Sequence, residues 1–158
     1  MKENYLFNEQ SDISMLESEL SEQMTMTHSV LNALYLEFME HIKQPEKQQL
    51  LVLLFKQMKE VQVLHSALYE KNANMPEQGL FVLNPQAKSD DLRIEFMELI
   101  YTLNSICLIT YDVLLDEIND HLLNTLSALM RATRKIVRIA EEINLRAQTF
   151  KGLPEFTS

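Results

Sequence analysis

The stretch "LLDEINDHLLNTL", from Leu114 to Leu126, decides the fold, because the chain either turns back here or continues as one helix. Apolar residues on both sides of it stay in phase at helical spacing, and no glycine or proline lies between Pro85 and Gly152. One helix of about 60 residues and roughly 90 Å is therefore possible. Such a helix would force dimerisation, because its own chain could not cover it.

We favour a tight turn at Asn119 and Asp120, with Asp120 capping the last helix, because very long helices are uncommon. Helical apolar spacing recurs over the rest of the chain, Ser11 or Asp12 can cap a first helix, and Pro45 separates the first two. We therefore predict one all-α domain over residues 1–158, a four-helix bundle with a long connection between its second and third helices. The expected helices span residues 11–44, 45–72, 90–118 and 120–149, and the connection spans 73–89.

The long connection resembles that of ferritin-like bundles, in which this link crosses the length of the bundle. Its apolar segment "LFVL", Leu80 to Leu83, is expected to lie against the helices. The resemblance implies a two-metal centre built partly from Glu-x-x-His motifs. The residues three positions before the four histidines are Thr25, Phe38, Gln62 and Ile118, so that motif is absent.

Two Glu-x-x-x-His pairs remain, Glu37 with His41 and Glu117 with His121. A spacing of four places both groups of a pair on one helical face. If the connection crosses over, the two pairs lie at opposite ends of the bundle; in an up-down bundle they share one end, where a metal could bind. We interpret them as exposed helix-surface pairs and expect no metal and no cofactor.

The charge and the cysteine content of the chain limit the functions that it can have. The chain has 158 residues, a net charge of −9 and a single cysteine, Cys107. The negative charge disfavours general binding to nucleic acid or to anionic lipid. With no second cysteine there is no internal disulfide, which fits a cytoplasmic protein, and Cys107 lies on an apolar stripe where a thiol stays protonated and inert. The longest aliphatic run, "LLVLLF", is too short to span a membrane.

The remaining polar residues inside helices favour structural roles. His65 and His28 are expected to be partly buried with hydrogen-bond partners. The hydroxyls of Thr27, Thr110 and Thr133 can bond back to carbonyls of their own helices.

A basic row stands out in the segment "RATRKIVR": Arg131, Arg134 and Arg138 share a helical face, with Lys135 beside them. The first 22 residues are acidic by contrast. The row is either a solvated face that attracts the N-terminus of its own or a sister chain, or a docking face for an acidic protein. Binding to a nucleic-acid backbone is a third, weaker alternative.

Helix one carries apolar residues off its main stripe, at Met26, Tyr35, Leu36 and Met39. They indicate a second apolar face, which either the "LFVL" segment or a partner covers. We therefore hypothesise a non-enzymatic protein-interaction module, such as an adaptor, chaperone, immunity protein or small regulator, acting as a homodimer. The alternative is a metal-binding or redox bundle with an atypical site at the two Glu-x-x-x-His pairs.

Overall fold

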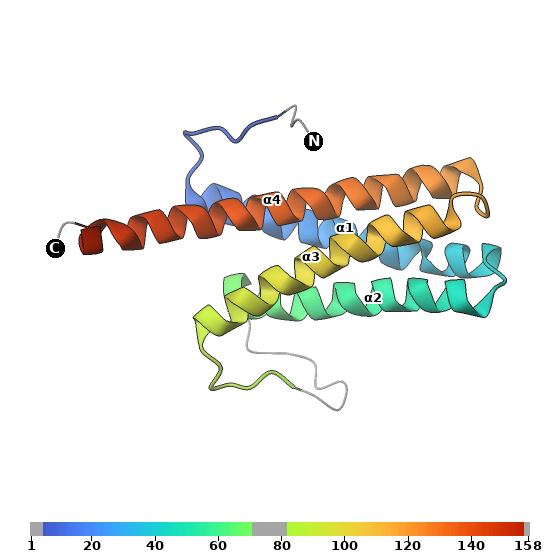
Figure 1. Ribbon diagram of the computed structural model, residues 1–158, viewed down its shortest axis with the longest axis horizontal. Helices are drawn as coiled ribbons and strands as arrows, with labels where there is room; N and C mark the ends of the chain where they lie inside the picture. Colours follow the sequence, from blue (N-terminus) through green and yellow to red (C-terminus); the bar gives the residue numbers. More distant parts are fainter. Residues whose placement is uncertain (1–4, 71–81, 157–158) are drawn as a thin grey trace.

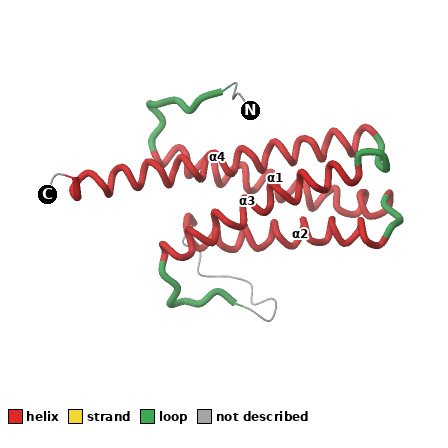
Figure 2. Tube along the Cα trace, viewed as in Figure 1, coloured by secondary structure: helices red, strands yellow, loops and turns green. Residues whose placement is uncertain are grey.

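The computed structural model describes residues 5–70 and 82–156 and forms a four-helix bundle (Figures 1 and 2). Over these residues there are four α-helices, one short π-helix and no strand, which confirms the predicted all-α bundle. The elements are α1 (Ile13–His41), α2 (Pro45–His65), η1 (Ser66–Glu70), α3 (Ser89–Leu114) and α4 (Asp120–Phe156).

The chain turns back between α3 and α4. The amide of Ile118 bonds to the carbonyl of Leu114, which closes the last turn of α3. The side chain of Asn119 then accepts a bond of 2.9 Å from the amide of Leu122. Asn119 is thus the N-cap of α4. Asp120, the predicted N-cap, is instead the first helical residue, where its negative charge interacts favourably with the positive end of the helix dipole.

The other helix starts follow local sequence. The Asp12 carboxylate caps α1 by accepting from the Met15 amide at 2.8 Å. Pro45 opens α2 at a position where a missing N–H costs nothing. The third helix starts at Ser89, one residue before the expected range of 90–118, and Lys88 occupies its cap position without a side-chain bond.

The four helices run alternately up and down around one core, each packed against two neighbours (Figure 1). Gln57 of α2 donates to the carbonyl of Leu99, and Lys47 near the start of α2 pairs with Glu117 just past the end of α3. These contacts make α2 and α3 antiparallel.

The expected ferritin-like crossover is therefore wrong, because the long connection begins and ends at the same end of the bundle (Figure 1). A long link permits a crossover, but the packing of α2 against α3 sets the direction of the chain. Of the "LFVL" segment, Leu80 and Phe81 lie outside the described residues. Val82 is exposed, and Leu83 packs half-buried against the core.

The core runs the full length of the bundle. Its largest fully buried side chains include Phe38, Phe96, Met58, Leu103 and Leu126. The buried threonines differ from one another. Thr110 and Thr133 donate to carbonyls of their own helices, as predicted, whereas the buried hydroxyl of Thr27 has no hydrogen-bond partner, which corrects the expectation for that residue.

Replacing the cap tests the turn. Asn119→Ala should lower the free energy of unfolding by about 1 kcal/mol, because the Leu122 amide loses its acceptor. Urea unfolding followed by circular dichroism measures the change. Asn124→Ala, on the exposed surface of α4, is the matched control and should be neutral or slightly stabilising. Equal stability of the Asn119→Ala variant and the wild type would contradict the cap assignment.

Candidate functional site

An N-terminal arm, residues 5–12, precedes α1 and runs alongside the outer face of α4 (Figure 1). It is not helical, and it contains a turn at Glu9 and Gln10. The side chain of Asn8 accepts from the amide of Gln10 at 3.0 Å, and its carbonyl accepts from the amide of Ser11 at 3.0 Å. This turn points backbone carbonyls of the arm towards α4.

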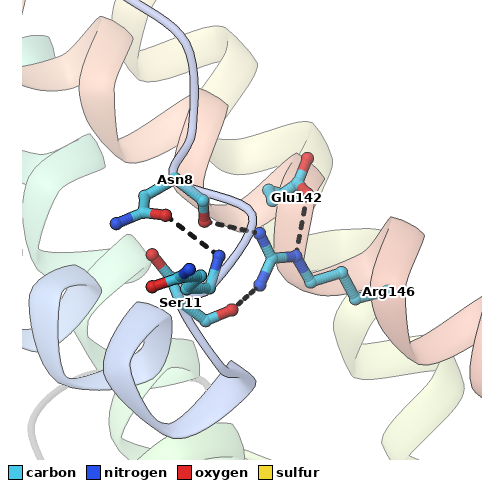
Figure 3. Close-up of polar contacts among 5 residues, drawn as sticks. Asn8, Ser11, Glu142 and Arg146 are labelled. Atoms are coloured by element: carbon cyan, nitrogen blue, oxygen red, sulfur yellow. Dashed lines mark hydrogen bonds and ion pairs between the residues drawn. The ribbon is translucent and has the colours of Figure 1, made fainter.

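Arg146 of α4 holds the turn (Figure 3). Its Nε donates to the Glu142 carboxylate at 2.9 Å, which fixes the plane of the guanidinium. Its two terminal nitrogens then donate to the carbonyls of Ser11 and, at 3.5 Å, of Asn8. Glu142 and Arg146 stand one helical turn apart, so α4 itself pre-positions the donors.

Arg138 holds the other end of the arm. Its Nη2 donates to the carbonyl of Tyr5 at 2.9 Å, and its guanidinium carbon lies 5.2 Å from the centre of the Phe7 ring. This geometry combines a charge-assisted hydrogen bond with a cation–π contact. Arg138 and Arg146 are eight residues apart and therefore lie about 12 Å apart along one face of α4.

The structure brings only part of the predicted basic row to the arm. Arg138 contacts it, whereas Arg131 and Lys135 have exposed side chains and Arg134 is half-buried. Arg146 was not among the predicted residues, although its offset of eight from Arg138 repeats the helical face. The contacts of Arg138 and Arg146 with residues 5–12 go to backbone carbonyls and to the Phe7 ring.

Hollows flank the arm on both sides. One, of about 540 Å³, is lined in part by Phe7, Arg138, Tyr101 and Leu145. The other, of about 400 Å³, lies towards α1 and reaches Met15. The arm itself covers little, because Tyr5 is 80% exposed and Leu6 is 86% exposed.

A row of exposed apolar side chains follows α3 and its C-cap residue Leu115, next to the first hollow. Ile94, Tyr101, Leu108 and Leu115 recur every seven residues and are 37–61% exposed. Tyr101 also hydrogen-bonds to Glu141 of α4, and its burial and that carboxylate raise the pKa of its hydroxyl. A third hollow of about 500 Å³ between α3 and α4 is lined by Ile94 and Tyr101. Ile94 and Tyr101 therefore form part of one wall of a groove between α3 and α4.

The predicted second apolar face of α1 is divided in the structure. Met26 and Leu36 are exposed, but Tyr35 and Met39 pack half-buried against the core. The Tyr35 ring lies 4.8 Å from that of Phe55 on α2, so α2 covers part of this surface.

The two Glu-x-x-x-His pairs do not assemble into a metal site. Because α1 and α3 run in the same direction, both pairs lie at the same end of the bundle. The imidazole of His41 donates to the backbone carbonyl of Glu37 at 2.9 Å, and the Glu117 carboxylate pairs with Lys47. Across residues 5–70 and 82–148, no three His, Cys, Asp or Glu side chains cluster closely enough to hold a metal ion.

Cys107 lies at the waist of the bundle and is buried, as predicted. Burial raises the pKa of its thiol to about 12, although a hydrogen bond with Thr133 partly offsets this. Asn104 donates to the hydroxyl of Thr133 at 2.9 Å, which ties α3 to α4. A thiol with this pKa stays protonated at neutral pH and is a poor nucleophile.

His65, the last residue of α2 before η1, is buried. His65 lies between the Ser21 hydroxyl, 3.3 Å from Nε2, and the Glu70 carboxylate, 3.7 Å from Nδ1. The rings of Tyr69 and Phe96 pack beside it. Burial lowers the pKa of the imidazole, and Glu70 partly counteracts this.

The order serine, histidine, glutamate resembles a hydrolytic triad only in its connectivity. Ser21 lies in the interior of α1, where neighbouring backbone amides are engaged in helical hydrogen bonds, so none can form an oxyanion hole beside it. The imidazole is also almost fully buried. The contacts of His65 therefore link α1 to the end of α2 and serve the fold.

Comparisons of the chain with protein-family models, curated proteins and solved structures gave no match. Within the part of the chain that the structure describes, no helix combines the length and hydropathy needed to cross a membrane. We therefore infer a function from the surface that α3, α4 and the arm form.

The lowered pKa of His65 predicts a pH dependence of stability. Because the folded pKa lies below the unfolded value of 6.5, the unfolded chain binds more protons as the pH falls through 6.5. The contribution of His65 to stability is therefore complete above pH 6.5 and decreases towards acid. Urea unfolding between pH 7.5 and 5.5 should show a shallower slope for His65→Phe than for the wild type.

His121→Gln, which removes an exposed imidazole, serves as the control and should retain the wild-type slope. An unchanged slope in His65→Phe would show that this imidazole is not the group responsible.

Proposed function

We propose that the protein is a non-enzymatic interaction module of the cytoplasm, which binds another protein through apolar and charged helix faces and acts as a homodimer. The observation that carries this proposal is the row of Ile94, Tyr101, Leu108 and Leu115 on the solvent side of α3. Exposed apolar side chains in a continuous patch are typical of interaction surfaces.

The spacing of the row supports pairing with another helix. Seven-residue repeats keep side chains on one seam, as in helices that pack side by side. Met97 and Tyr111, half-buried, lie three residues after Ile94 and Leu108, and so extend the 3-4 spacing. A second copy presents the same row, and a twofold axis would place the two rows against each other.

Charge also favours self-association over nucleic acid. The outer side of α3 carries Glu98 and Asp112, whereas the outer side of α4 carries Arg131 and Lys135. Each copy thus offers both an acidic helix and a basic helix to the other. With a net charge of −9, the chain as a whole repels a phosphate backbone.

Sedimentation equilibrium of the wild type and of Ile94→Glu tests this proposal. The wild type should dimerise at micromolar concentration, and Ile94→Glu should weaken the dimer at least about tenfold, because it buries an unpaired charge in the seam. Ile94 is 61% exposed, so the substitution leaves the core of each subunit intact.

Leu53→Glu is the matched control. Leu53 is 48% exposed on α2, the helix across the bundle from α4, and its substitution should leave the dimer unchanged. A wild type that stays monomeric at all micromolar concentrations would contradict the homodimer, as would equal effects of the two substitutions.

A further inference from the structure

We infer that the N-terminal arm occupies a peptide-binding groove on α4, and that the partner this groove fits is a protein segment that is extended, acidic and carries an aromatic side chain. The inference rests on the proposed interaction function and names a second surface for it. In the structure, the arm occupies the site to which the partner segment would bind.

The contacts of the arm are of a kind that another chain can reproduce. Arg138 and Arg146 donate to the carbonyls of Tyr5, Ser11 and Asn8, and every extended peptide offers such carbonyls. The guanidinium of Arg138 also lies against the ring of Phe7. These contacts recognise an extended backbone and an aromatic ring.

The arm fills its place incompletely. The hollows of about 540 and 400 Å³ lie along its two edges, and the apolar side chains of Tyr5 and Leu6 remain largely in solvent. A partner segment could keep the carbonyl contacts and fill these hollows with its own side chains. The arm is therefore a weak occupant with a high effective concentration.

Charge identifies the partner as acidic. Arg131, Lys135, Arg138 and Arg146 outnumber the carboxylates of Glu141 and Glu142 on this part of α4, while the chain as a whole carries −9. The arm itself contains Glu9 and ends in Asp12. Acidic residues flanking the aromatic ring would approach this basic surface favourably, and salt would weaken the attraction.

A peptide-binding experiment on the full chain tests the inference. The probe is a fluorescein-labelled peptide of sequence YLFNEQSD, which copies residues 5–12, and fluorescence anisotropy measures its affinity. In Phe7→Ala the chain's own arm loses its ring contact with Arg138. The probe should bind this variant about tenfold more tightly than the wild type, because a weaker tethered competitor now opposes it.

Further variants identify the groove. Adding Arg138→Gln or Arg146→Gln to Phe7→Ala should reduce probe affinity at least about tenfold, because guanidinium–carbonyl bonds are lost. Adding Lys56→Gln, which removes an exposed positive charge on α2, should not. A scrambled peptide of equal charge should bind more weakly than the probe. Asn8→Ala, whose side chain is exposed, loosens the arm at its turn and should also strengthen probe binding if Phe7→Ala does not fold.

Other outcomes overturn the inference. Equal affinity of the probe for the wild type and both arm variants would show that the arm does not compete. Affinity independent of Arg138 and Arg146 would place the peptide elsewhere. Tighter binding of a single-stranded RNA than of the probe would make the occupant a nucleic acid. If the wild-type dimer dissociates on Phe7→Ala, the occupant is the arm of a second copy.

The test also separates this inference from the proposed function. Ile94→Glu should weaken the dimer but leave Arg138-dependent probe binding in the Phe7→Ala background. Probe binding without a dimer supports the groove and rejects the α3 interface, and a dimer without probe binding does the reverse.

Discussion

The structure depends on the reversal of the chain over residues 115–119. The apolar stripes of α3 and α4 can cover each other only if the chain turns back on itself there. The turn has no glycine or proline, and the side chain of Asn119 supplies the acceptor that starts α4. Once the turn forms, Asn104 of α3 hydrogen-bonds to Thr133 of α4, and Cys107 is buried in the middle of the bundle. The bundle then closes without contribution from a second chain.

Closure of the core determines where chemistry is available. The waist is lined by aliphatic, sulfur and threonine side chains, and its thiol is held protonated. The buried imidazole of His65 is engaged in joining α1 to the end of α2. What remains for binding lies outside the core, on α3, on α4 and on the arm. There, the Glu142 carboxylate orients the guanidinium of Arg146 on α4.

The sequence predicted the features that neighbouring residues determine, and it missed features that depend on how the helices pack against one another. The cap at Asp12 and the start of α2 at Pro45 follow from neighbouring residues. Periodicity predicts helices throughout, and the rarity of very long helices predicts the break between the last two. The direction of α3 depends on which face packs against α2, and loop length carries no such information. Tyr35 was predicted as part of a partner surface, but its cover, Phe55, lies on another helix. The bond from Arg138 to a backbone carbonyl of the arm could likewise not be predicted from the sequence, because a row of positive charges suggests carboxylate partners.

A distance within one chain tests the closed bundle most directly. Asp90 at the start of α3 and Gln148 on α4 line the same hollow. Spin labels at Asp90→Cys and Gln148→Cys, in a Cys107→Ala background diluted with unlabelled protein, report their separation by pulsed electron paramagnetic resonance. The closed bundle predicts about 10 to 20 Å, the spacing of packed helices plus the label arms. One continuous helix through residues 115–119 would place the labels roughly 85 Å apart, and such a result would contradict the account.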